Sequence, residues 1–289
     1  MAKRMRIRES LFEKSDSPLK IVAIYLTLIA ACVISLIPIW MIFNMSLRPS
    51  QTLYTTELAF VPSDMTWENY RVMLFEKPLL GWMGNSIIVS GLTAVISVAI
   101  AATAGYALSR FRFTGRKGFL TFLLTTQMFP APMLLLPTFL LLSQFKLLNT
   151  YQGMIIPYVA TAIPFSTWMM KGFYDTIPVE LEYAAAIDGA SNWQSFFRIT
   201  LPLAAPALAI SALFAFMTGW SEYIIARVVL TKAAMYTLPV GLVTLQSSFN
   251  TEWGRYSAGA LMTMIPAMIL FIAFSRYLVG GLTLGGVKG

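Results

Sequence analysis

Residues 21–43 read IVAIYLTLIAACVISLIPIWMIF, an apolar run without a single charged side chain. At about 1.5 Å per residue, a helix of this length crosses a bilayer core of about 30 Å. Predominantly apolar runs of similar length recur along the chain, at residues 85–108, 119–142, 153–170, 204–226 and 256–279. The sequence therefore predicts an all-α, polytopic membrane protein with six transmembrane helices.

The composition of the chain agrees with this and excludes several kinds of site. Of the 289 residues, 57% are hydrophobic and 12% are charged, and the mean hydropathy is +0.69. Soluble domains carry about 25% charged residues. The chain has no histidine and one cysteine, so it lacks His-dependent catalysis, imidazole metal ligands and an internal disulfide. We expect no catalytic residue, no metal, no cofactor in this chain, and an inert, packed thiol at Cys32.

The distribution of basic residues predicts the orientation of the chain in the membrane. If the N-terminus is inside, 14 of the 21 Lys and Arg residues lie on the cytoplasmic side. This bias is the one that the positive-inside rule expects, with both termini in the cytoplasm. We expect a cytoplasmic tail at 1–20, a membrane domain at 21–279 and a second tail at 280–289. The net charge of +8 is explained by orientation, with anionic lipid as a weaker alternative and no nucleic acid partner.

Charges are almost absent from the predicted spans. Ion-coupled carriers usually keep an ionisable group at mid-membrane. Here Glu222 is the one acidic candidate, and its place late in the fifth run favours an interfacial or pore-mouth role over a proton site. Prolines are frequent in the spans, above all in the segment 129–137, and predict kinks that either improve packing or bend helices along a moving path. Any energy for transport is expected to come from another subunit.

The segment 175–203 between the fourth and fifth spans has the pattern of a helix–turn–helix. Asp175 or Thr176 can cap a first helix, with Pro178 in its first turn. The pair Asp188-Gly189 is a stop and turn signal. Ser191 and Gln194 then have the spacing of a capping box for a second short helix, which Pro202 ends.

The run YAAAIDGA at 183–190, followed by Ile199 and by Leu201-Pro202, strongly resembles the EAA loop of ABC importer permeases. Over most of its length the chain is similar to the second permease subunit of carbohydrate importers, most closely of the maltose/maltodextrin (MalG-like) type. One position departs from the pattern, because Tyr183 stands where the family has a glutamate. Glu182, one residue earlier, could supply a substitute charge.

The resemblance implies a type I ABC importer permease fold in a prokaryotic plasma (inner) membrane. It also implies the partners: a second, MalF-like permease subunit, two ATP-binding subunits that carry ATP and Mg, and an extracytoplasmic sugar-binding protein that the loop around 236–241 would touch. The loop 175–203 would contact an ATP-binding subunit through Glu180, Glu182, Tyr183, Ala184, Ala185, Asp188, Gly189 and Ala190. The tail would reach the same subunits through Gly285, Gly286, Val287 and Lys288, after a helix stop at Gly280-Gly281.

Aromatic side chains in and near the spans are candidates for stacking on sugar rings along the path, although aromatic residues at membrane interfaces are commonly anchors. These candidates are Tyr158, Phe165, Trp168, Phe216, Trp220 and Tyr223. The function predicted is a permease subunit for an oligosaccharide such as maltodextrin. The alternatives are another solute such as trehalose or glycerol phosphate, an ion-coupled secondary transporter, and a membrane-embedded enzyme, for which no nucleophile and base are visible.

Overall fold

The computed structural model describes residues 18–49, 64–246 and 251–284. Four of its helices are long and apolar enough to cross a membrane: α2 (Pro18–Ser46), α4 (Leu79–Arg110), α7 (Tyr151–Tyr174) and α14 (Trp253–Leu284). Two further pairs of helices pass the same test together, although each pair is sharply bent. The six expected spans are therefore present when each bent pair counts as one. All four of these helices are longer than the spans predicted for them; α4, for example, begins at Leu79 and α7 covers 151–174.

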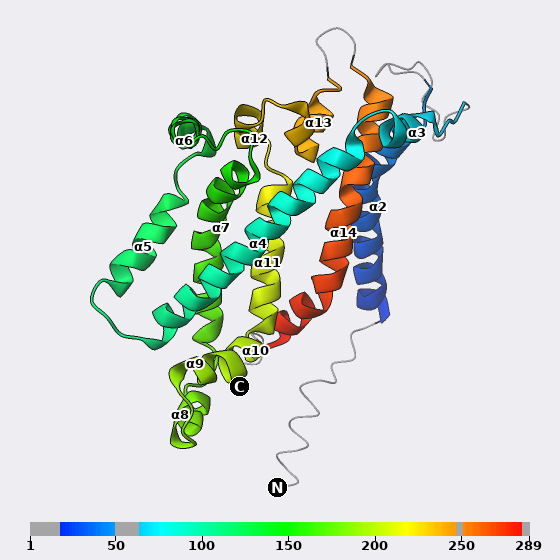
Figure 1. Ribbon diagram of the computed structural model, residues 1–289. Helices are drawn as coiled ribbons and strands as arrows, with labels where there is room; N and C mark the ends of the chain where they lie inside the picture. The colour runs from blue at the N-terminus through cyan, green and yellow to red at the C-terminus, as the bar shows by residue number, and fades with distance from the viewer. Residues whose placement is uncertain (1–17, 50–63, 247–250, 285–289) are drawn as a thin grey trace.

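Helix α4 is the centre of the bundle and packs along both α7 and α11 (Ala205–Trp220; Figure 1). Small residues let the three backbones approach, as is usual between membrane helices. A Cβ on Gly105 of α4 would lie 2.9 Å from the Met170 Cβ and the Lys171 backbone nitrogen of α7. A Cβ on Gly219 of α11 would lie 3.1 Å from the Ser90 Cα of α4. The two glycines thus lie at the contacts of α4 with α7 and of α11 with α4.

The third predicted span is not one helix. It consists of α5 (Arg116–Thr126) and α6 (Ala131–Gln144), which meet at an angle of 97°. The cause is local, because Pro130 has no N–H to donate and disfavours a helical conformation at Phe129. The expected kink in this proline-rich segment is present, but it is a break rather than a bend.

The fifth span is also interrupted, at both of its ends. The chain passes through α9 (Asn192–Ser195), the π-helix η1 (Phe196–Thr200) and α10 (Leu201–Leu203), then bends by 76° at Ala204 before α11 begins. Pro206 in the first turn of α11 has no N–H with which to continue the earlier helix. At its other end, α11 stops at Trp220, six residues before the predicted end at Ala226.

Glu222 explains this early end of α11. Its carboxylate accepts hydrogen bonds from the backbone N–H groups of Ile225 and Ala226, at 2.8 and 3.1 Å, and from the Tyr158 hydroxyl at 2.6 Å. A side chain that accepts from the first N–H groups of a helix favours a new start at that point. Glu222 therefore starts a separate helix, α12 (Ile224–Val229).

Short helices lie at the two ends of the bundle (Figure 1). At the end where α4 begins are α3 (Glu68–Phe75), α12, the 3₁₀ turn η2 (Ala233–Met235) and α13 (Leu238–Val243). At the opposite end are α8 (Glu180–Ile187) and α9. The loop around 236–241, predicted to touch an extracytoplasmic protein, and the loop 175–203, predicted to touch an ATP-binding subunit, thus lie at opposite ends of the bundle.

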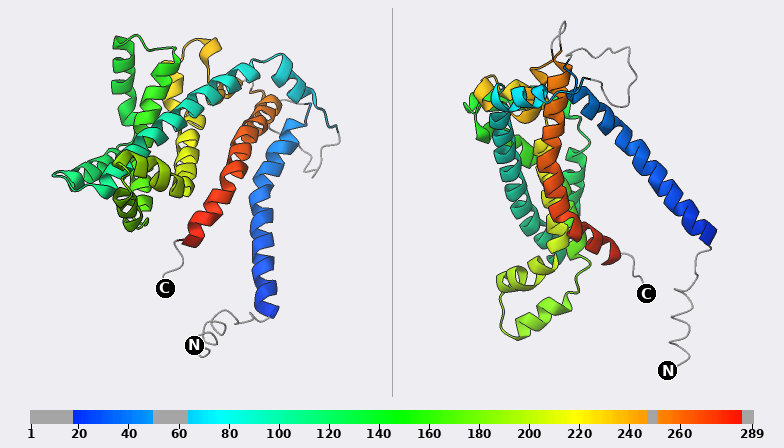
Figure 2. Two further views of the ribbon diagram at one scale, coloured as in Figure 1. Left: turned by 60° about the horizontal axis from the view of Figure 1, so that its bottom comes forward. Right: turned by 90° about the vertical axis from the view of Figure 1, so that its right-hand side faces the viewer.

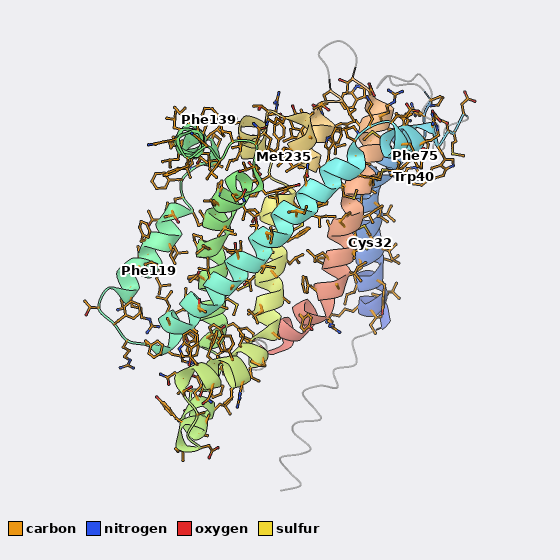
Figure 3. The ribbon with its side chains drawn as sticks, viewed as in Figure 1. Cys32, Trp40, Phe75, Phe119, Phe139 and Met235 are labelled. Atoms are coloured by element: carbon orange, nitrogen blue, oxygen red, sulfur yellow. The ribbon has the colours of Figure 1, made fainter. Side chains whose placement is uncertain are left out.

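Helix α2 stands apart from the bundle. It contacts α14 near the end of the molecule where α3 lies and diverges from it toward Pro18 (Figure 2). Its residues between Leu19 and Ile39 are exposed. Cys32 lies on this surface (Figure 3), so the expectation of a packed thiol is wrong for the isolated chain. The reason is that the apolar neighbours of Cys32 face the surroundings of the protein instead of its core.

Helix α14 continues beyond the predicted stop at Gly280-Gly281 and ends at Leu284. Two adjacent glycines weaken a helix but do not end it when the helix already has many turns behind it. The residues predicted to touch the ATP-binding subunits through the tail, Gly285, Gly286, Val287 and Lys288, lie outside the described residues.

Candidate functional site

The predicted coupling loop forms a helical elbow that extends beyond the ends of the long helices (Figure 1). None of the side chains of α8 is buried. Tyr183 is 66% exposed and Ile187, one turn later, is 87% exposed, and Leu181 is exposed on another side of the helix. An exposed group of large apolar side chains on a protruding helix is typical of a surface that another protein covers.

Local sequence determines the turn of this elbow. Gly189 has a φ of +85°, which glycine adopts at little cost, and it ends α8 as predicted. Ser191 and Gln194 form the predicted capping box. The Gln194 N–H donates to the Ser191 Oγ at 3.3 Å, and the Ser191 N–H donates to the Gln194 Oε1 at 2.8 Å. Both predictions are confirmed.

The predicted start of the first helix is wrong. Helix α8 begins at Glu180, after Pro178, and has no side-chain cap. Asp175 instead follows the end of α7, where its carboxylate accepts hydrogen bonds from Lys171 and from the Ser109 hydroxyl. The Thr176 hydroxyl donates to the Phe173 carbonyl oxygen. Both candidate caps therefore stabilise the end of α7, and neither starts α8.

The predicted coupling residues divide between two sides of the elbow. Glu182 points inward: its carboxylate accepts hydrogen bonds from Arg110, Tyr106 and Thr200. Exposed side chains are those of Glu180, Tyr183, Ala184 and Asp188, and Gly189 is exposed as well, while Ala185 and Ala190 are half-buried. A single helix cannot present adjacent residues on one face, since they lie about 100° apart. Glu182 is therefore not positioned to substitute for a charge at position 183.

The six aromatic candidates for the sugar path lie in different surroundings. Tyr158 is 1% exposed, and its hydroxyl donates to Glu222. Tyr158 belongs to a cluster of buried apolar residues, and Tyr223 packs against that cluster. Trp220 is buried and stacks on Phe216 at 5.4 Å between ring centroids.

The remaining two candidates, Phe165 and Trp168, lie on α7. Phe165 contacts Phe214 of α11 at 4.7 Å between ring centroids, and Trp168 is exposed. The structure thus stacks Trp220 on Phe216 and distributes the other four candidates over different surroundings, and the six do not form one lining.

An apolar groove lies between α4, α11 and α14. Its volume is about 680 Å³. Small residues of α4 such as Gly91 and Ala94 form one side, and Phe216, Leu270 and Phe274 form the other. Of the predicted path residues, Phe216 lines this groove.

Three polar residues that the sequence reasoning missed connect the chain at the other end of the bundle. The Asn85 amide donates to the carbonyl oxygens of Ala234 and Tyr236, each at 2.9 Å, and the Ser86 hydroxyl accepts from the Leu238 N–H at 2.8 Å. Asn149, on the loop before α7, accepts from the N–H groups of Thr231 and Lys232. These bonds attach the segment 231–238 to α4 and to the start of α7. The sequence contained one signal for this contact: the polar pair Asn85-Ser86 stands at the start of an apolar run.

A charged contact joins α14 to the same end of the bundle. Glu252 lies 3.4 Å from Lys77 and 2.7 Å from Arg255. Partial burial raises the pKa of Glu252, but the hydrogen bond from Arg255 and the attraction of Lys77 outweigh it, so the pKa lies below its usual value of 4.5. The Glu252 carboxylate, which stays ionised at neutral pH, thus connects the start of α14 to the segment between α3 and α4.

Comparison with known proteins identifies the family. Residues 97–283 match the family described as "Binding-protein-dependent transport system inner membrane component". The arabinooligosaccharides transport system permease protein AraQ of Halalkalibacterium halodurans is 37% identical over 259 residues, which cover 89% of this chain and 92% of that protein. The maltose/maltodextrin transport system permease protein MalG of Salmonella typhimurium is 33% identical over 97% of this chain and 100% of its own length.

A solved structure agrees with these relatives. A chain in the crystal structure of a bacterial ABC transporter involved in the import of the acidic polysaccharide alginate has a TM-score of 0.75 and 28% identity to this chain. The match covers 92% of this chain and 98% of that one. The predicted resemblance is confirmed, and with it the reading as a transport subunit rather than an enzyme. The chain belongs to the family of binding-protein-dependent transport system inner membrane components, as a multi-pass permease subunit of an ABC transporter.

Proposed function

We propose that this permease forms half of a translocation path for an oligosaccharide of the maltodextrin kind. Support comes from its similarity to permeases that are named for arabinooligosaccharides and for maltose/maltodextrin, and to one that serves alginate import. Those three substrates share chains of sugar units and differ in charge and linkage. Trehalose and glycerol phosphate remain alternatives within the same family.

The partners belong to the same proposal. An extracytoplasmic binding protein delivers the sugar to the end of the bundle that carries α3, α12 and α13. A second, MalF-like permease completes the path, and two subunits that bind ATP and Mg supply the energy. Both termini of this chain lie in the cytoplasm.

The observation that carries the proposal is the elbow formed by α8 and α9. It protrudes from the end of the bundle opposite α13 (Figure 1), and the exposed side chains of Tyr183 and Ile187 make its surface apolar there. ATP can drive transport only if it binds more tightly to one conformation of the complex than to the other. A helix held by an ATP-binding subunit and joined to two spans would transmit that preference to the path.

Tests of this function use the complete complex in liposomes, with maltotriose as the transported probe. We expect Asp188→Arg and Gly189→Pro to abolish uptake while ATP hydrolysis continues, because arginine reverses the charge of the exposed Asp188 and proline cannot adopt the positive φ of Gly189. Gly189→Asn is the matched control: after glycine, asparagine tolerates a positive φ better than most residues, so it should retain more uptake than Gly189→Pro. The proposal fails if Asp188→Arg and Gly189→Pro transport normally. Uptake that persists after ATP depletion would support an ion-coupled carrier instead.

A further inference from the structure

The carboxylate of Glu182 is the centre of a partly buried cluster, here called the Glu182 cluster, that consists of Glu182, Arg110, Tyr106 and Thr200. Arg110 Nε donates to Glu182 Oε1 at 2.7 Å, the Tyr106 hydroxyl donates to Oε2 at 2.7 Å, and the Thr200 hydroxyl donates to Oε1 at 2.9 Å. The side chains of Arg110 and Glu182 are 9% and 13% exposed. A charge pair with so little access to water needs such additional donors to offset the loss of hydration.

The members of this cluster come from three separate segments. Tyr106 and Arg110 are on the last turns of α4, Glu182 is on α8, and Thr200 ends the π-helix that leads through α10 into α11. Arg110 also donates to the carbonyl oxygen of Ile177, in the segment between α7 and α8. One carboxylate thus connects α8 both to α4 and to the start of the fifth span.

Helix α8 has few other attachments. Within the part of the chain that the structure describes, the hydrogen bonds from its side chains to other elements are all made by Glu182. None of its residues is buried, so apolar packing adds little. A force applied to α8 can reach the rest of the molecule through the Glu182 cluster or through the two chain connections at its ends.

We propose that Glu182 is a positioning residue: it makes α8 move as one body with the end of α4 and with the helix before α11. This inference rests on the proposed coupling role of α8. It reverses the expectation that Glu182 supplies the missing charge at the docking surface, and it leaves that surface with the neutral side chain of Tyr183 where the family pattern has a carboxylate.

The first test measures uptake of maltotriose per ATP hydrolysed by the complete complex in liposomes. Glu182→Gln keeps the size of the side chain but removes the charge that Arg110 requires. We expect the ratio of uptake to hydrolysis to fall by about tenfold, while hydrolysis continues. Asp175→Asn is the matched control, because it makes the same chemical change in an exposed carboxylate that bonds to α4 but not to α8. Its ratio should stay within about twofold of the unsubstituted complex.

The second test covers the case in which Glu182→Gln fails to assemble. Thr200→Val removes only the hydroxyl that donates to Glu182 and leaves the ion pair with Arg110 in place. It should lower the ratio in the same direction but by a smaller factor. A normal ratio in Thr200→Val, together with failed assembly of Glu182→Gln, would mean that the cluster serves only folding, and the proposal would be overturned.

The third test does not depend on the sugar. Spin labels at Leu181→Cys and Thr103→Cys, in a Cys32→Ser background, report the distance between α8 and α4, and both sites are exposed. We expect one distance that ATP leaves unchanged, and a broader distribution in the same protein with Glu182→Gln. If Glu182→Gln keeps both the distance and the ratio, the proposal is wrong. If the unsubstituted complex neither hydrolyses ATP nor transports, the proposed function has failed instead.

Discussion

Gly105 offers a direct test of how closely α4 and α7 pack. A Cβ placed there would lie 2.9 Å from both the Met170 Cβ and the Lys171 backbone nitrogen, so alanine forces the two helices apart. Gly91 is the matched control on the same helix, because a Cβ at that position meets nothing within 4 Å. Both substitutions gain about 1 kcal/mol from the better helix propensity of alanine.

The two variants differ in the cost of overpacking, which is about 1–3 kcal/mol and applies to Gly105→Ala alone. We therefore expect Gly105→Ala to be less stable than Gly91→Ala by that amount. A change of 1 kcal/mol shifts the Tm of a protein of this size by about 2–4 °C. The assay is thermal unfolding of the purified protein in detergent, at one scan rate for all variants. A Tm of Gly105→Ala equal to or above that of Gly91→Ala would refute the close crossing.

Two further predictions concern the end of the bundle near α13. The pKa of Glu252 is lower in the folded protein than its usual value of 4.5, so its ion pairs stabilise the fold above that pH and are lost as the pH falls through the lowered value. Thermal unfolding should therefore show Glu252→Gln less stable than the unsubstituted protein at neutral pH and equally stable in strong acid, and a constant gap would contradict this. Asn149→Ala removes the acceptor for the N–H groups of Thr231 and Lys232 and should cost about 1–3 kcal/mol, whereas Asn149→Asp retains that acceptor. Faster hydrogen exchange at residues 231–232 in Asn149→Ala alone would support the assignment, and equal exchange in both variants would count against it.

Features that depend on neighbours in the sequence could be predicted. Apolar runs of sufficient length predicted the spans, since the bilayer imposes one length on every crossing segment. The turn at Gly189 and the capping box of Ser191 and Gln194 were also predicted, because each depends on residues within a few positions. The EAA-like pattern identified the family through the same local stretch of chain.

Features that depend on distant residues could not. The direction of Glu182 is determined by Arg110, which is 72 positions away in the sequence. The early end of α11 depends in part on Tyr158, which donates to Glu222 across 64 positions. Pro130 indicated a disturbed helix, but a proline specifies only which hydrogen bond is missing. The angle of 97° between α5 and α6 also depends on their distant neighbours, because α5 contacts α7 and α6 contacts α12.

The π-helix at 196–200 constrains the length of the chain between the elbow and the fifth span. A π-turn accommodates one residue more than the α-helical turn it replaces. Deleting one residue from this segment before Thr200 would let it close as an ordinary α-helix, and the chain on its two sides would keep its relative orientation, because the π-turn already holds that residue within one turn. One residue inserted here and wound into α-helix would instead rotate everything before it by about 100° about the helix axis. Thr200 and Glu182 could then no longer meet. Substitutions and a single deletion here can be absorbed, whereas a single insertion, which most surface loops tolerate, would turn the elbow away from the end of α4.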